Sequence, residues 1–115
     1  MKKLILVAAL MVMSSQLLAA KRTVNCQIDS GNQVAYQGKC LFLADADGSF
    51  SLSNVNENKV LLDEISLVNV YIIDKGIAEV RGLTTDGINS RWGEAKRSEK
   101  DKACWLGSDF KVCAW

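Results

Sequence analysis

The alternation of hydrophobic and polar stretches along the chain predicts strands and turns throughout. Runs rich in valine, isoleucine, leucine and aromatic side chains are typical of strands, and clusters of aspartate, asparagine, serine and glycine are typical of the turns between them. The expected strands cover residues 23–28, 34–44, 49–52, 59–62, 65–73, 77–83 and 91–97, and a final hairpin covers 104–113. Short strands at this spacing predict an all-β fold, a small antiparallel β-sandwich or a barrel-like sheet.

Residues 60–70 also fit a second interpretation, an amphipathic helix. The apolar residues in this stretch follow helical spacing only in part. The high content of β-branched residues, and the hairpin turn expected at Asp74-Lys75-Gly76, favour strands instead. As a strand, residues 65–73 would belong either to the core or to a dimer interface.

The first twenty residues have the layout of a secretory signal peptide. Lys2 and Lys3 precede an apolar run over residues 4–13, and the small residues Ala19 and Ala20 follow. The apolar run is too short to span a bilayer comfortably. We therefore expect cleavage after Ala19 or Ala20, export of the mature protein, and no membrane insertion of that protein.

The expected mature part, residues 21–115, has the size of a single domain. Two of the 14 basic residues belong to the signal segment, so the mature part contains 12 basic and 13 acidic residues. A balance this close to neutral gives no case for binding nucleic acid or an anionic membrane surface.

The expected export bears on the oxidation state of the four cysteines, Cys26, Cys40, Cys104 and Cys113. An even number of cysteines in an oxidising compartment favours disulfides. A metal site is the alternative, but the chain has no histidine and no C-x-x-C spacing. We therefore expect two disulfides and no metal.

Hairpin geometry predicts how these cysteines pair. If Ser108 and Asp109 form a two-residue turn, Cys104 lies opposite Cys113 on a non-hydrogen-bonded pair, where the Cα atoms are about 4.5 Å apart. A disulfide tolerates that distance. Cys26 and Cys40 likewise bracket an expected hairpin around residues 29–32. The predicted pairs are thus Cys26–Cys40 and Cys104–Cys113, each stabilising the fold by about 2–3 kcal/mol.

The residue types give little support for catalysis. Without histidine, the Ser–His–Asp and Cys–His arrangements are excluded, and cysteines held in disulfides offer no thiolate. Asp45-x-Asp47-Gly48 is similar to the start of a calcium loop, but Asn56 stands where the twelfth position needs a carboxylate, which favours a plain turn. We expect no catalytic residue, no metal and no cofactor.

Residues 82–98 form the segment with the most features of a binding surface. It contains tryptophan and arginine, which dominate binding hot spots. The candidate partner-binding residues are Arg91, Trp92, Glu94, Lys96 and Arg97. On a regular strand Arg91 and Arg97 would share one face, and Trp92, Glu94 and Lys96 the other. The alternative is that Trp92 packs in the core and the charged groups are simply solvated. Trp105 and Trp115 are expected to cover the Cys104–Cys113 bond.

Several stretches together resemble a known family. These are residues 38–40 (GKC), 78–83 (AEVRGL), 87–95 (GINSRWGEA) and 103–113 (ACWLGSDFKVC). They are similar to periplasmic immunity proteins that protect a bacterium from a type VI secretion effector that cleaves peptidoglycan, notably the lysozyme-like effector carried on a VgrG spike protein in Vibrio.

This resemblance implies a β-sandwich, as monomer or homodimer, that plugs the glycan-binding groove of the effector. A looser likeness is to periplasmic lysozyme inhibitors, which carry a short Ser-Gly-x-x-Tyr loop. Here the spacing from Ser30-Gly31 to Tyr36 departs from that loop, so an inhibitory role is not transferred to Ser30. The expected function is inhibition of a secreted peptidoglycan-degrading effector or lysozyme, and a periplasmic module that binds a glycan or small molecule is the alternative.

Overall fold

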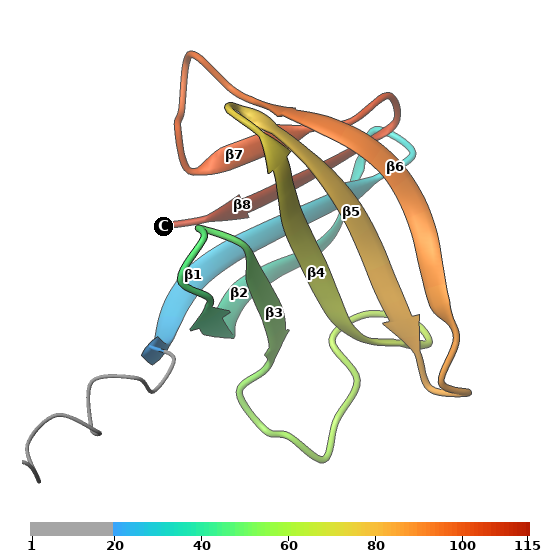
Figure 1. Ribbon diagram of the computed structural model, residues 1–115. Coiled ribbons are helices and arrows are strands. Elements are labelled where there is room, and N and C mark those ends of the chain that lie inside the picture. The colour runs from blue at the N-terminus through green and yellow to red at the C-terminus, as the bar shows by residue number, and fades with distance from the viewer. Residues whose placement is uncertain (1–19) are drawn as a thin grey trace, which may run out of the picture.

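The computed structural model describes residues 20–115, and in this part of the chain eight antiparallel strands form a closed barrel (Figure 1). Residues 1–19 of the expected signal segment lie outside the described residues. The strands are β1 (Ala20–Ser30), β2 (Gln33–Ala44), β3 (Phe50–Asn54), β4 (Ile65–Asp74), β5 (Ile77–Thr84), β6 (Asn89–Arg97), β7 (Cys104–Leu106) and β8 (Phe110–Ala114). The expected all-β fold is therefore confirmed, in its barrel form.

Each strand pairs with the next one along the chain, and β1 closes the ring by pairing with β8. In Figure 1, β1, β2 and β8 run behind β4, β5 and β6 and cross them steeply. Every strand therefore has a neighbour on both sides, and the seam between β6 and β7 is the shortest, with two residue pairs. This single closed sheet differs from the β-sandwich that the resemblance implies.

Turn chemistry explains why the longest hairpin forms where it does. β1 and β2 pair from Ala20↔Ala44 to Ser30↔Gln33 and are joined by Gly31 and Asn32 alone. Both turn residues have positive φ, 62° at Gly31 and 65° at Asn32. Glycine and asparagine tolerate this conformation best, and a two-residue turn of this kind matches the twist of the flanking strands.

The expected strand over residues 59–62 is wrong. Residues 55–64 form the connection between β3 and β4, and only Leu62 makes an isolated bridge, to Ile65. Leu61 and Leu62 are buried in the core cluster. These two side chains close one end of the barrel and do not belong to a strand. The helix over 60–70 is also wrong, since β4 begins at Ile65.

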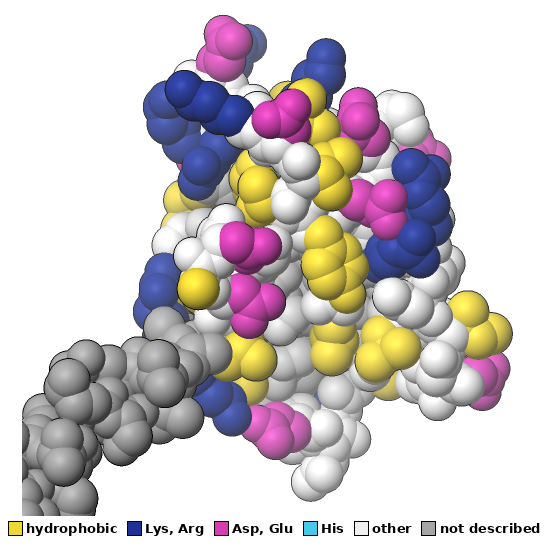
Figure 2. All heavy atoms as spheres, viewed as in Figure 1, with side chains coloured by type: hydrophobic (Ala, Val, Ile, Leu, Met, Phe, Trp, Pro, Cys, Tyr) yellow, Lys and Arg dark blue, Asp and Glu magenta, His cyan; other side chains and the backbone are white. Residues whose placement is uncertain are grey.

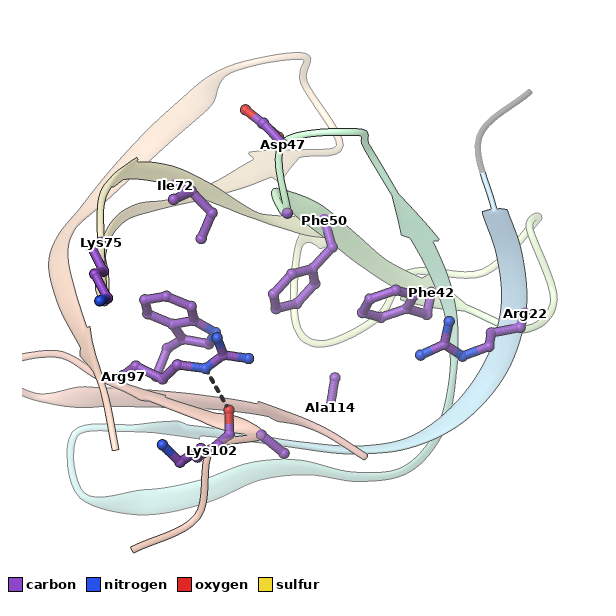
Figure 3. A pocket seen from close by; sticks show the side chains of 13 residues that line it. Arg22, Phe42, Asp47, Phe50, Ile72, Lys75, Arg97, Lys102 and Ala114 are labelled. Atoms are coloured by element: carbon purple, nitrogen blue, oxygen red, sulfur yellow. Dashed lines mark hydrogen bonds between the residues drawn. The ribbon is translucent and has the colours of Figure 1, made fainter. Parts of the chain in front are cut away.

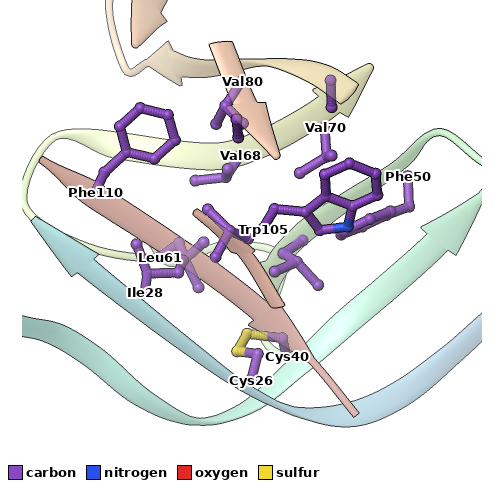
Figure 4. Close-up of a cluster of buried hydrophobic side chains, with 14 of the residues drawn as sticks. Cys26, Ile28, Cys40, Phe50, Leu61, Val68, Val70, Val80, Trp105 and Phe110 are labelled. Atoms are coloured by element: carbon purple, nitrogen blue, oxygen red, sulfur yellow. A yellow bond between two sulfur atoms is a disulfide. The ribbon is translucent and has the colours of Figure 1, made fainter. Parts of the chain in front are cut away.

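The core consists of the inward-facing residues of each strand. On β4, Val68 and Val70 are fully buried, whereas Tyr71 and Ile73 point out and are exposed. The segment 65–73 thus contributes to both the core and the outer surface. Figure 4 shows the buried cluster, with the Cys26–Cys40 bond at its edge beside β1 and β2.

Both predicted disulfides are present. Cys104 lies directly opposite Cys113, and Trp105 lies opposite Val112, as the two-residue turn requires. Cys26 is paired with Gly38 and Cys40 with Val24, so this bond runs diagonally between β1 and β2 inside the barrel. The Cys104–Cys113 bond is also buried but lies outside the core cluster.

The two disulfides should therefore contribute unequally to stability. In the chain-entropy model the Cys26–Cys40 loop is worth about 3 kcal/mol and the shorter Cys104–Cys113 loop slightly less. Replacing Cys26 and Cys40 by alanine also leaves empty volume in the core, which adds to the loss. We expect the Cys26→Ala/Cys40→Ala variant to lose more free energy of unfolding than Cys104→Ala/Cys113→Ala, measured by urea denaturation. A larger loss in the second variant would contradict this.

Candidate functional site

The two ends of the barrel differ. One end is filled by Leu61 and Leu62 from the β3–β4 connection. At the opposite end a cavity of about 430 Å³ opens between the strand ends and the β2–β3, β4–β5 and β6–β7 connections (Figure 3). We call this opening the barrel mouth. Its apolar lining includes Phe42, Phe50, Ile72 and Trp105, and its basic residues are Arg22, Lys75, Arg97 and Lys102.

Two arginines of the barrel mouth are held against aromatic rings. The Arg97 guanidinium carbon lies 5.3 Å from the centre of the Trp105 ring, and Arg97 Nε donates a hydrogen bond of 2.8 Å to the Lys102 carbonyl. The Arg22 guanidinium carbon lies 4.6 Å from the centre of Phe42. In Figure 3 both guanidinium groups point inward from opposite sides of the opening. Cation–π contacts of this kind restrict where each charge sits.

Aromatic stacking forms the floor between the two arginines. Phe42 stacks on Phe50 with 4.9 Å between ring centres. Phe50 and Trp105 belong to the buried core cluster and are only 9% and 3% exposed. Trp105, expected to cover the Cys104–Cys113 bond, belongs to the core cluster instead and lines the cavity. Trp115 is half exposed, and its indole N–H donates to Asp101.

The barrel mouth carries an excess of positive charge. Asp47 is the one acidic residue among its lining residues. Asp47 accepts a hydrogen bond of 2.9 Å from the Ser49 backbone N–H. Hydrogen bonding from Ser49, above all from this N–H, holds the pKa of Asp47 below its usual value. Within residues 20–115, none of the four cations of the barrel mouth takes part in an ion pair.

A β-bulge on β6 separates the five candidate residues predicted from sequence. Val80 pairs with Gly93 and Arg81 with Arg91, so Trp92 is an extra residue on β6. Gly93 has a φ of 129°, which glycine adopts easily. The bulge breaks the period of two, so that Trp92 no longer shares a face with Glu94. The expectation of two regular faces across residues 91–97 is therefore wrong.

Trp92 faces the barrel interior. It packs against the core cluster and lies edge-on to Phe110, with 5.8 Å between ring centres. An added Cβ at Gly82 would lie 2.9 Å from the indole nitrogen. The structure thus has the alternative arrangement, in which Trp92 packs against the core.

The other four candidate residues lie in two places. Arg97 lies at the barrel mouth. Arg91, Glu94 and Lys96 are exposed on the outside of the barrel. There Arg91 Nε lies 3.2 Å from a carboxylate oxygen of Glu79.

The outside of β4, β5 and β6 carries both charged and apolar groups. Glu79 binds Arg81, at 2.6 Å, as well as Arg91. Hydrogen bonds from Arg81 and then Arg91 hold the pKa of Glu79 below its usual value of 4.5. Tyr71, directly opposite Glu79 on β4, is 38% exposed, and Ile73 is 57% exposed. Figure 2 shows hydrophobic side chains down the middle of this face and charged groups beside them. We call it the β4–β6 face.

Sequence reasoning missed the barrel mouth as a site, although one signal was present. Arg22 is in phase with Val24, Cys26 and Ile28, which all face the interior. A charged residue at the inward phase of a strand end indicates an opening in the barrel. Phe42 and Phe50 gave no such signal because aromatic residues on strands usually belong to the core.

Metal binding, membrane-spanning helices and likeness to known proteins can each indicate function. Within residues 20–115, no group of three or more acidic or cysteine side chains is arranged to hold a metal ion. The same residues include no helix long and apolar enough to cross a membrane. Comparison with known protein families, curated proteins and solved structures finds no match to the chain.

The contact between Gly82 and Trp92 can be tested by substitution. Gly82→Ala should lower the free energy of unfolding by about 1–3 kcal/mol, because the new methyl group would overlap the indole. The loss should be smaller in a Trp92→Phe background, where the ring is shorter. Chemical denaturation of the four proteins in this cycle measures the coupling. Equal losses in both backgrounds would show that Trp92 is not the constraint.

The Glu79 ion pairs predict a pH dependence. Because its pKa is lowered on folding, ionised Glu79 stabilises the native state above the ordinary pKa of 4.5, and this contribution disappears as pH falls through the native pKa. Glu79→Gln should therefore be less stable than the parent at pH 7 and equally stable well below pH 4.5. Thermal unfolding at both pH values measures this, and a difference that persists in acid would contradict it.

Proposed function

We propose that this protein is an exported inhibitor of a peptidoglycan-cleaving, muramidase-like enzyme, acting as an immunity protein that occludes the enzyme's active-site groove. A lysozyme is the second target class. The observation that carries the proposal is the β4–β6 face, where exposed apolar side chains lie beside arginines and carboxylates on three adjacent strands.

The β4–β6 face has the composition of a protein-binding surface. Tyr71 and Ile73 supply apolar anchors, and Arg81 and Arg91 supply donors in the adjacent row. Tyrosine and arginine are enriched in binding hot spots, which polar groups usually surround. Leu106, 44% exposed on β7 opposite Lys96, extends the apolar part of this face.

The electrostatics of this face suit a groove lined by carboxylates. Arg91 is more than half exposed, and its contact with Glu79 is a surface ion pair. Surface ion pairs contribute little to stability, so Arg91 can turn from Glu79 to a carboxylate of the bound enzyme at small cost. A bidentate contact between guanidinium and carboxylate would then fix the orientation of the complex.

The scaffold supports inhibition by obstruction. The sheet is closed and cross-linked by two disulfides, so little conformational freedom remains to be lost on binding. Two disulfides in a domain of this size are also consistent with export, where a wall-degrading target would be met. The resemblance to periplasmic immunity proteins agrees with the same target class.

Co-expression and inhibition test the proposal directly. The full chain should protect cells that express a muramidase effector in the periplasm, and the purified protein should form a one-to-one complex that no longer degrades peptidoglycan. A lysozyme is assayed in parallel. A deletion strain that tolerates attack by muramidase-armed neighbours, together with no complex in either assay, would overturn the proposal.

Substitutions on the β4–β6 face locate the contact. Tyr71→Ala and Arg91→Ala should each weaken inhibition tenfold or more, as hot-spot residues do. Val34→Ala and Lys39→Ala remove exposed side chains from β2 and serve as matched controls. Undiminished inhibition by folded Tyr71→Ala and Arg91→Ala proteins would remove this face from the proposal.

A further inference from the structure

We infer that the barrel mouth binds a free organic acid: an anionic carboxylate, sulfonate or phosphate group joined to a compact aromatic or aliphatic body. This site is separate from the β4–β6 face, and the inference does not depend on inhibition of a wall-degrading enzyme. It rests on the shape, the lining and the charge of the cavity.

The cavity has the size and lining of a small-molecule site. Its volume of about 430 Å³ lies within the range of typical ligand pockets. Its walls reach the buried rings of Phe50 and Trp105, and Ile72 and Ala114 add further apolar surface. A ligand body placed there would leave water for an apolar environment, which favours binding.

The charges at the opening select an anion. Arg22, Lys75, Arg97 and Lys102 surround the cavity, and within residues 20–115 none of them is neutralised by an ion pair. The single carboxylate, Asp47, is already bonded to the backbone of its own turn. Four cations against one acid make a cation an unfavourable occupant and favour an anion over a neutral ligand.

Two of the four cations are positioned in advance for a headgroup. Arg97 uses Nε for the Lys102 carbonyl, and this bond and the Trp105 ring orient the rest of the guanidinium. Arg22 is oriented by Phe42 across the opening. Guanidinium groups bind carboxylate, sulfonate and phosphate oxygens through paired N–H donors. Because these contacts restrict both groups, less side-chain entropy is lost when an anion enters.

The cavity favours a free molecule over a segment of a protein partner. The opening is ringed by three connections, at Asp47-Gly48, Lys75-Gly76 and Lys102-Ala103. The apolar surface lies below this ring, on Phe50 and Trp105. A compact molecule can pass the ring and cover these side chains, whereas a flat protein surface would meet the connections first.

A pair of fluorescent probes tests the inference. Anilinonaphthalene sulfonate carries an aromatic body and one anionic group, and N-phenyl-1-naphthylamine has the same rings without the charge. The full mature protein should bind the sulfonate saturably, at one site, and at least tenfold more tightly than the neutral probe. Raising the salt concentration should weaken binding of the sulfonate and leave the neutral probe unaffected. Equal affinity for both probes would overturn the inference.

Matched arginine variants place the anion. Arg22→Gln and Arg97→Gln should each weaken sulfonate binding about tenfold. Arg91→Gln, on the outside of the barrel, should leave it unchanged. Equal weakening by Arg91→Gln would overturn the assignment, as would undiminished binding by a folded Arg22→Gln/Arg97→Gln protein.

The tryptophans give a readout that needs no substitution. The indole N–H signal of Trp105 in a nitrogen–proton correlation spectrum should shift on titration with the sulfonate. That of Trp92, which packs on Phe110 away from the mouth, should stay in place. A shift of Trp92 alone would overturn the inference.

A second outcome would also overturn the inference. If the barrel mouth binds no free anion, yet its arginines are required for inhibition of a muramidase, the mouth is part of a protein interface.

Discussion

Closure of the sheet by β1 and β8 is the constraint on which the rest of the structure depends. β6 and β7 share only two residue pairs, so the C-terminal hairpin is held mainly by β1. Five consecutive pairs join Cys26–Ser30 to β8, and the Lys111–Asp29 ion pair lies on this seam. The Gly31 N–H extends the seam by donating to the Asp109 carbonyl. Without these contacts β1 and β8 would both present open edges.

Closure also explains why the two ends of the barrel differ. A closed ring of eight strands has limited interior volume, and here small residues such as Val68, Val70 and Ala78 fill its middle. One long connection, residues 55–64, brings Leu61 and Leu62 over one end. The connections at the other end carry charge and glycine instead, so apolar surface inside the barrel remains accessible there.

Much of this architecture could be predicted from the sequence because it depends on local chemistry. Turn residues and strand propensity located all eight strands and added a ninth, over residues 59–62, that does not form, and hairpin geometry gave the Cys104–Cys113 register. Two features depend on long-range contacts and were missed. The hydrophobic pattern around Leu61 and Leu62 predicts a strand, but these side chains fill interior space that exists only once the barrel is closed. The extra residue at Trp92 is set by packing against Gly82 and Phe110.

The same long-range effects divided the predicted binding residues between two surfaces. Without the bulge, Trp92 would lie on the same face as Glu94 and Lys96, and an aromatic anchor would stand among charges on one strand. The bulge moves the indole into the core, so Tyr71 on β4 becomes the aromatic group next to those charges. Beyond the bulge Arg97 is in phase with the buried Ala95 and lies opposite Trp105, and its guanidinium reaches the mouth. One inserted residue thereby separates the proposed protein-binding face on the outside from the proposed anion site at the barrel mouth.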